Sequence, residues 1–218
     1  GMNAMIVDSS ALTEQVVVDV VASAFDSAGQ RCSALRVLCV QDEVADHTLK
    51  MLRGAMAECR MGNPGRLTTD IGPVIDAEAK ANIENHIQAM RAKGRPVYQA
   101  VRENSEDARE WTSGTFVAPT LIELASFDEL KKEVFGPVLH VVRYNRNNLD
   151  QLIAQINASG YGLTLGVHTR IDETIAQVTG SANVGNLYVN RNMVGAVVGV
   201  QPFGGEGLSG TGPKAGGP

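Results

Sequence analysis

Strand-like and helix-like segments alternate regularly between residues 138 and 189, and this pattern constrains the fold more than any other feature of the sequence. The strand candidates are short and rich in β-branched residues, whereas the helix candidates repeat their apolar residues at helical spacing. Parallel strands need a crossover connection, so a helix between two strands favours parallel pairing. We therefore predict a three-layer α/β/α fold with a mainly parallel sheet. The strands are predicted at 138–144, 165–168 and 184–189, and the helices at 149–158 and 172–179.

The first half of the chain adds a helix that ends at a conspicuous turn. Residues 12–25 carry apolar side chains at helical spacing after Ser9 and Ser10, which are predicted to cap the first turn. A polar, glycine-containing break follows, and residues 34–40 then predict a strand, so Cys32 lies on a helix-to-strand connection. Elsewhere we predict helices at 44–59 and 76–92, the second capped by Asp76, strands at 97–101 and 120–123, a solvated loop at 103–110 and an ordered loop at 195–218.

The composition indicates one globular domain. The 218 residues are 44% hydrophobic, which is enough to bury one substantial core. A formal net charge of -5 argues against nucleic acid or an anionic membrane as a partner, and no apolar run approaches the roughly 20 residues that cross a bilayer. We therefore expect a cytoplasmic protein with a small-molecule partner. Gly1 and Met2 resemble a protease-cleavage scar ahead of an engineered start codon, which would leave residues 3–218 as the domain.

Cys32 is the first candidate for chemistry. The chain has three cysteines without CxxC spacing, which favours reduced thiols over disulfides or a zinc site. A catalytic cysteine needs an accessible setting that stabilises the thiolate, and Cys32 lies in a glycine-containing turn beside Arg31. Cys39 alternates within an apolar strand and Cys59 lies at a helix end, so both are expected to be buried or half-buried. The residues alone leave Cys32 as structural or catalytic.

Two other sequence patterns give weaker evidence of a functional site. The four histidines are scattered without ligand spacing, so no metal site is predicted. Residues 205–210 match GxGxxG, but no predicted strand leads into them and no helix follows, so we do not interpret them as a dinucleotide-binding fingerprint.

Three segments resemble a known family. Residues 29–33 read GQRCS, 133–138 read EVFGPV and 202–205 read PFGG, followed by Ser209 and Gly210. In order and separation these segments resemble the three signatures of the aldehyde dehydrogenase superfamily. Three signatures in register are far more specific than any one of them.

The amino-acid sequences of three further segments resemble a narrower group of proteins. Residues 3–10, 23–30 and 204–212 are similar to the bacterial proline utilization A proteins, and this resemblance runs from about residue 3 to the end. In that group the region belongs to the L-glutamate gamma-semialdehyde dehydrogenase module, also called 1-pyrroline-5-carboxylate dehydrogenase. The resemblance thus implies an NAD-dependent oxidation of a carboxylate-bearing aldehyde in proline catabolism.

The resemblance also implies roles for named residues. Cys32 would attack the aldehyde carbon, and its backbone amide would help to hold the oxyanion. Loss of hydride to NAD would give a thioester, which water hydrolyses. Glu133 would bind the nicotinamide ribose hydroxyls, with the Phe135 ring packed beside it. Without the resemblance, we would interpret Glu133 as part of a strand-entry salt bridge and Phe135 as a core aromatic.

A second set would bind the substrate. Ser33 and the backbone amides of Gly195 and Ala196 match the family's anchor for the substrate carboxylate, and Phe203 matches an aromatic that lines the aliphatic chain. The alternative is that Gly195 and Ala196 only form a tight turn.

Some groups implied by the resemblance do not occur in these 218 residues. They are a glutamate just upstream of the segment that begins at Asn3, which activates water, an asparagine much further upstream that completes the oxyanion hole, the upstream NAD-binding domain, and the tail that would follow Pro218. We therefore expect this polypeptide alone to have negligible dehydrogenase activity. The resemblance further implies a homo-oligomer and, in some relatives, an FAD-dependent proline dehydrogenase domain and a DNA-binding segment.

Three alternatives stay open at this point. The same fold could serve as a non-catalytic oligomerisation or scaffolding module, since fold alone does not decide function. A dehydrogenase for a different aldehyde is the second. A cysteine hydrolase is the third and weakest, because it needs a histidine base near the thiol and no local signature marks one.

Overall fold

The computed structural model describes residues 1–100, 114–197, 199–210 and 214–215, so the predicted loop at 103–110 lies outside the described residues. The strands in this part of the chain are β1 (Ala4–Val7), β2 (Val37–Gln41), β3 (Val97–Gln99), β4 (Thr120–Leu124), β5 (Val138–Tyr144), β6 (Tyr161–Gly162), β7 (Thr164–His168), β8 (Asn186–Val189) and β9 (Glu206–Gly207). Among these, seven form one sheet in the order β3-β4-β5-β2-β1-β7-β8, and β6 pairs separately with β9. Within the larger sheet only β3 runs antiparallel to its neighbour, so the predicted mainly parallel sheet is confirmed.

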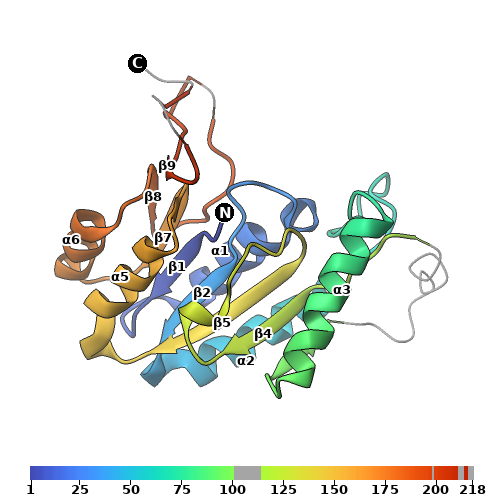
Figure 1. The fold of residues 1–218 in the computed structure, drawn as a ribbon, viewed down its shortest axis with the longest axis horizontal. Coiled ribbons are helices and arrows are strands. Elements are labelled where there is room, and N and C mark those ends of the chain that lie inside the picture. Colours follow the sequence, from blue (N-terminus) through green and yellow to red (C-terminus); the bar gives the residue numbers. More distant parts are fainter. Residues whose placement is uncertain (101–113, 198, 211–213, 216–218) are drawn as a thin grey trace.

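Helices cover both faces of this sheet. The described helices are α1 (Thr13–Phe25), α2 (Asp42–Glu58), α3 (Ala77–Ala92), α5 (Leu149–Ala158) and α6 (Asp172–Ser181). Figure 1 shows α1 and α2 behind the sheet and α3 and α5 in front of it, which confirms the three-layer arrangement. None of the described helices is long and apolar enough to cross a membrane.

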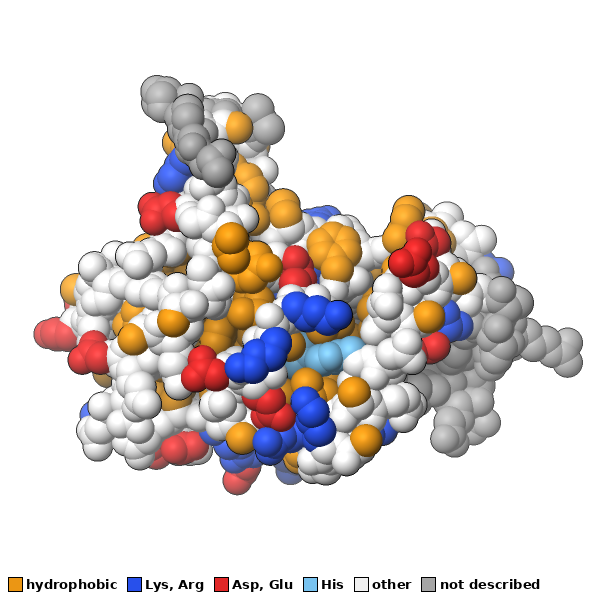
Figure 2. Space-filling view, in the orientation of Figure 1, with side chains coloured by type: hydrophobic (Ala, Val, Ile, Leu, Met, Phe, Trp, Pro, Cys, Tyr) orange, Lys and Arg blue, Asp and Glu red, His pale blue; other side chains and the backbone are white. Residues whose placement is uncertain are grey.

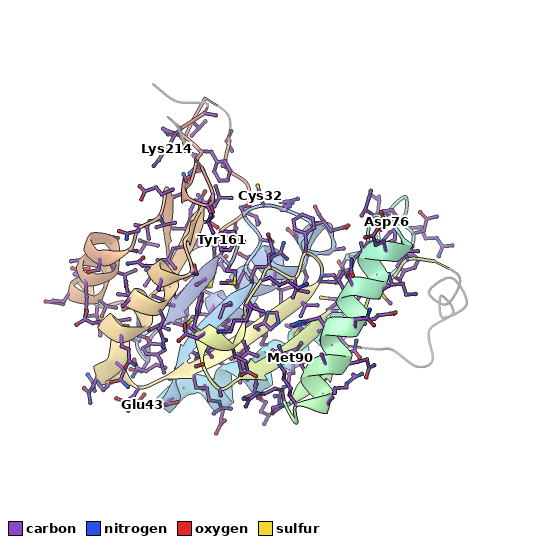
Figure 3. All side chains as sticks on the ribbon, viewed as in Figure 1. Cys32, Glu43, Asp76, Met90, Tyr161 and Lys214 are labelled. Carbon is purple, nitrogen blue, oxygen red and sulfur yellow. The ribbon has the colours of Figure 1, made fainter. Side chains whose placement is uncertain are left out.

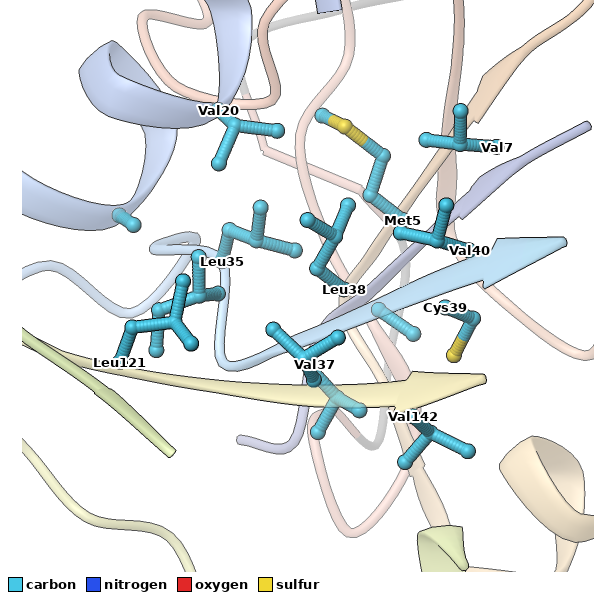
Figure 4. Close-up of a cluster of buried hydrophobic side chains, with 14 of the residues drawn as sticks. Met5, Val7, Val20, Leu35, Val37, Leu38, Cys39, Val40, Leu121 and Val142 are labelled. Atoms are coloured by element: carbon cyan, nitrogen blue, oxygen red, sulfur yellow. The ribbon is translucent and has the colours of Figure 1, made fainter. Parts of the chain in front are cut away.

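The core follows from the central position of two short strands. Every residue of β1 and β2 is buried, because each strand has a neighbour on both edges and a helical layer on both faces. Figure 4 shows Met5 and Val7 of β1 beside Leu38 and Val40 of β2, with Val20 of α1 packed above them. This packing fixes the start of β2, and therefore the turn that precedes it.

Most predicted elements are confirmed, with shifted ends. The predicted strand 138–144 and helix 149–158 agree with β5 and α5. Asp76 caps α3, where its side chain accepts a hydrogen bond from the Ala79 N–H at 2.7 Å. In the described part of 195–218, β9 pairs with β6 and Phe203 pairs with Ala215, as expected for an ordered loop.

Two expectations about the N-terminal segment need correction. Ser9 and Ser10 do not cap α1, whose N-cap is Leu12 without a side-chain hydrogen bond; the Ser10 hydroxyl instead donates to Asp8 Oδ1 at 2.6 Å. The first strand, β1, was not predicted at all, although it lies in the middle of the sheet. Four apolar residues are too short a run to show a period.

Candidate active site

Cys32 lies at the edge of the sheet where the parallel strands begin. It follows α1 and the short 3-10 turn η1 (Asp26–Gly29), and precedes β2. Arg31 to Ala34 form a turn closed by the Ala34 N–H, which donates to the Arg31 carbonyl at 3.1 Å. The Cys32 side chain is exposed, and Figure 3 shows it at this edge, between α3 and the C-terminal segment. A thiol here is available to solvent and to a substrate.

The chain enters this turn in a strained conformation. Ser27 and Ala28 have φ values of 56° and 54°, in the left-handed region that costs a side-chain-bearing residue about 1–2 kcal/mol. Gly29 follows with φ 66°, and a Cβ at this position would lie 2.2 Å from the Gly136 carbonyl oxygen. Only glycine fits here, so GQRCS begins with glycine for a steric reason.

Side chains hold this entry in place. Gln30 Nε2 donates to the Pro73 carbonyl at 3.2 Å, and its Oε1 accepts from the Ile75 N–H at 2.8 Å. Arg31 Nε donates to Ser27 Oγ at 3.0 Å. The strained backbone is therefore fixed by contacts on both sides.

The carbonyls of the cysteine turn all point into the protein. Asn3 Nδ2 donates to the carbonyls of Cys32 and Ala34, at 2.7 and 2.9 Å. Thr164 Oγ1 donates to the Ser33 carbonyl at 3.3 Å. Asn3 precedes β1 and Thr164 begins β7, so the amino ends of two strands secure this turn.

The Arg31 carbonyl sets the direction of the Cys32 amide. Arg36 Nη2 donates to that carbonyl at 3.2 Å from a fully buried side chain. In a trans peptide the C=O and the following N–H point in opposite directions. The Cys32 N–H therefore points away from the Arg31 carbonyl and from Arg36 Nη2.

One cavity of about 630 Å³ opens at the thiol. It brings together five of the seven residues that the sequence singled out, namely Cys32, Ser33, Gly195, Ala196 and Phe203. The same cavity is also lined by Gln30, Arg31, Val197, Gln201 and Ala215. Arg31 is a cationic residue in this lining, in addition to the predicted carboxylate anchor.

The other two residues, Glu133 and Phe135, do not line this cavity. Glu133 Oε1 accepts a hydrogen bond from Arg36 Nε at 3.2 Å, and its Oε2 contacts the Gly1 amine. Phe135 is 47% exposed, so the alternative of a core aromatic is wrong. The predicted strand-entry salt bridge of Glu133 exists, and its partner is Arg36.

Arg36 is the residue that sequence reasoning missed. Burial lowers the pKa of its guanidinium, and the neighbouring Glu133 carboxylate raises it. The signal was present: an arginine inside the apolar run 34–40, four residues after Cys32. A buried arginine is rare unless it is paired, so its position marks a second interaction centre beside the turn.

The three thiols differ in access. Cys39 is buried, and burial raises its pKa to about 12, whereas Cys59 is half-buried with its Sγ 3.6 Å from the Ala55 carbonyl.

At pH 8 a pKa near 12 leaves a thiolate fraction of about 10⁻⁴ at Cys39. Iodoacetamide at pH 8, followed by peptide mapping, is expected to label Cys32 before Cys59 and to leave Cys39 unlabelled. Denatured protein, the control, is expected to label at all three; equal labelling of the native thiols would count against a privileged Cys32.

None of the described histidines lines the cavity at Cys32. His140 is buried with its Nε2 2.8 Å from His86 Nε2, and burial lowers its pKa to about 3. Burial, Lys93 and Lys132 lower the pKa of His86, and Figure 2 shows Lys and Arg side chains around a histidine on this face. His168 Nε2 lies 3.4 Å from Asp19 Oδ2.

These positions bear on two alternatives. The described residues that line the cavity include no histidine, so the cysteine hydrolase lacks its base there. Among the described residues no group of three or more His, Cys, Asp or Glu side chains is placed to hold a metal ion.

Sequence comparison identifies the family of this mainly parallel α/β domain with its exposed cysteine. The model of the aldehyde dehydrogenase family matches residues 1–218, and the chain belongs to that family. It is 92% identical to the bifunctional protein PutA of Escherichia coli (strain K12), over 100% of the chain and 16% of that protein.

Solved structures agree with this placement. The crystal structure of a bifunctional proline utilization A protein matches with a TM-score of 0.92 and 54% identity, over 100% of the chain and 21% of that protein. A Thermus 1-pyrroline-5-carboxylate dehydrogenase with bound NAD matches with a TM-score of 0.86 and 34% identity, over 99% of the chain and 40% of that protein. The chain thus spans about a sixth of the length of its PutA relative.

Proposed function

We propose that this chain is the catalytic domain of an NAD-dependent dehydrogenase that oxidises L-glutamate gamma-semialdehyde to L-glutamate in proline catabolism. The observation that carries the proposal is the single cavity that joins the exposed Cys32 thiol to Ser33, Gly195, Ala196 and Phe203. The names of the similar proteins, PutA and 1-pyrroline-5-carboxylate dehydrogenase, support this substrate.

Cys32 is the nucleophile in this proposal. Its thiolate forms a bond to the aldehyde carbon, and the carbonyl electron pair moves to oxygen. The Cys32 N–H, which points away from Arg36, would donate to the resulting oxyanion. When the oxyanion collapses, hydride leaves the carbon and a thioester remains on sulfur. Water then displaces the thiolate and yields the acid.

Glu133 and Phe135 fit the nicotinamide end of NAD. Arg36 fixes the Glu133 carboxylate, which is partly exposed and can accept hydrogen bonds from two ribose hydroxyls. The half-exposed Phe135 ring offers an apolar surface beside it. When bound, NAD would supply the acceptor for the hydride. These two residues come from the turn before β5, whereas the nucleophile comes from the turn before β2.

The substrate carboxylate is proposed to bind at the far side of the cavity. Gly195 has φ 85°, and no atom lies within 4 Å of the position of an added Cβ, so the backbone there is open to a ligand. The amides of Gly195 and Ala196, together with the Ser33 hydroxyl, would form an anion-binding nest. Phe203 would then line the aliphatic chain between the carboxylate and the aldehyde.

Substrate preference tests this proposal. In the full-length protein that contains the chain, kcat/KM for glutamate semialdehyde is expected to exceed that for an uncharged aldehyde of equal length. Replacing Ser33→Ala removes a hydrogen bond to a charged group, and we expect a fall of about tenfold in kcat/KM for the semialdehyde. The same variant should leave kcat/KM for the uncharged aldehyde within about twofold. Equal kcat/KM of the wild type for both aldehydes would contradict the proposed carboxylate anchor. It would favour a dehydrogenase for a different aldehyde.

The parent protein carries further proposals. We propose a cytoplasmic homo-oligomer with NAD as the cofactor of this module and FAD in a separate proline dehydrogenase domain. The word bifunctional in the name of the Escherichia coli relative supports a second activity in the parent. The 218-residue chain alone is still expected to be inactive.

A further inference from the structure

Arg36 links the two turns that the proposed chemistry must bring together. Its side chain is fully buried and has three separate acceptors. Nη2 donates to the Arg31 carbonyl at 3.2 Å, in the nucleophile turn. Nη1 donates to the Gly136 carbonyl at 3.1 Å and Nε to Glu133 Oε1 at 3.2 Å, both in the turn before β5. The guanidinium carbon lies 5.1 Å from the centre of the Phe135 ring.

This arrangement is energetically expensive. Moving a cation out of water carries a large desolvation penalty, and apolar side chains of similar volume often give equal or greater stability in such a place. Glu133 provides the compensating charge, and it belongs to the turn rather than to the core. We therefore expect the buried guanidinium to contribute more to the relative placement of the two turns than to the free energy of unfolding.

The nucleophile turn needs such a support because it is strained. Ser27 and Ala28 stay in the left-handed region only while the surrounding contacts hold them. Gly29 lies against the Gly136 carbonyl, and Arg36 Nη1 donates to this same carbonyl. Arg36 thus fixes both the Arg31–Cys32 peptide and the surface on which the preceding residues rest.

We propose that Arg36 is a positioning residue for the dehydrogenase reaction: it aims the Cys32 N–H at the oxyanion and holds Glu133 and Phe135 at a fixed place beside the thiol. This inference rests on the proposed function. It assigns to one buried side chain the relative placement of the nucleophile and the cofactor. It leaves the carboxylate anchor at Gly195 and Ala196 untouched, because none of the contacts described for Arg36 reaches that loop.

The test uses the full-length protein with Arg36→Met and Arg36→Lys. Methionine keeps much of the volume and loses every donor, whereas lysine keeps the charge but cannot reach three acceptors in a planar fork. For Arg36→Met we expect kcat to fall about a hundredfold, as for a lost oxyanion donor, and KM for NAD to rise about tenfold. Arg36→Lys should lie between this variant and the wild type. KM for the semialdehyde should stay within about twofold in both.

Arg95→Met is the matched control. Arg95 also pairs with a carboxylate, Glu129, at 2.8 Å, but it lies beyond α3, in the connection to β3. This variant should keep the wild-type kcat and both KM values. Thermal unfolding of each variant separates loss of structure from loss of positioning.

The outcomes separate two failures. A wild-type protein that makes no NADH overturns the proposed function, and the positioning role with it. An active wild type, combined with an Arg36→Met protein that retains the wild-type kcat and KM for NAD at a temperature where it is folded, overturns the positioning role alone. If Arg36→Met does not fold, Arg36→Lys decides: unchanged kcat and KM for NAD reject the proposal, and the intermediate losses support it.

Discussion

Replacing Cys32→Ala in the full-length protein is expected to lower the rate of NADH formation from glutamate semialdehyde by about 10⁴-fold or more. The substitution removes the only atom that forms a covalent bond to substrate in the proposed route, and loss of an enzyme nucleophile has effects of this size. Stability should change little, because the Cys32 side chain is exposed. The measurement is the initial rate of NADH absorbance, recorded beside thermal unfolding.

Cys59→Ser is the control for this prediction. Cys59 is half-buried at the end of α2, and serine can keep a hydrogen bond to the nearby Ala55 carbonyl. Turnover of this variant should stay within about twofold of the wild type. A Cys32→Ala protein that retained a tenth of the activity would exclude Cys32 as the nucleophile and would favour an incidental thiol in a scaffold.

Gly29→Ala has the largest effect that we expect on stability. The new Cβ would lie 2.2 Å from the Gly136 carbonyl oxygen and 2.8 Å from the Ala24 carbonyl oxygen, and φ is 66°. Neither backbone atom can move without displacing β5 or α1, so we expect a cost of about 4 kcal/mol or more. For a domain of this size, that cost lowers the midpoint of thermal unfolding by about 10 °C. Activity should fall too, because the clash displaces the cysteine turn.

Gly54→Ala separates this steric effect from the general effect of adding a methyl group. Gly54 is exposed in the middle of α2, and an added Cβ there meets no atom within 4 Å. Alanine is the better helix former by about 1 kcal/mol, so this variant should unfold about 2–4 °C higher than the wild type. If both variants shifted the midpoint alike, the close approach of Gly29 to Gly136 would not exist in solution.

The sequence predicted residues 138–189 well, where strands alternate with helices, because there the apolar periodicity extends over each whole element. β5 and α5 agree with their predicted ends for this reason. β1 was missed because its four residues, Ala4–Val7, are buried on both faces and show no alternation. Its identity as a strand depends on pairing with β2 and β7, which local patterns do not contain.

The candidate site shows the same division. Signature segments located Cys32 and Ser33 on one side and Glu133 on the other, but nothing in the sequence showed how the two turns meet. They meet through Arg36, whose partner Glu133 is 97 positions away along the chain. Asn3, which holds the Cys32 carbonyl, is 29 positions away. Contacts over such separations are consequences of the fold, and local periodicity does not reveal them.

Trapping the covalent intermediate tests most directly whether Cys32 is the nucleophile. The full-length protein would be mixed with glutamate semialdehyde and NAD, quenched in acid during the first turnover, digested and analysed by mass spectrometry. We predict the acyl group of the substrate on the peptide that contains Cys32 and none on the peptides with Cys39 or Cys59. Rapid NADH formation without an acyl adduct on Cys32, or with the adduct on another cysteine, would contradict Cys32 as the nucleophile.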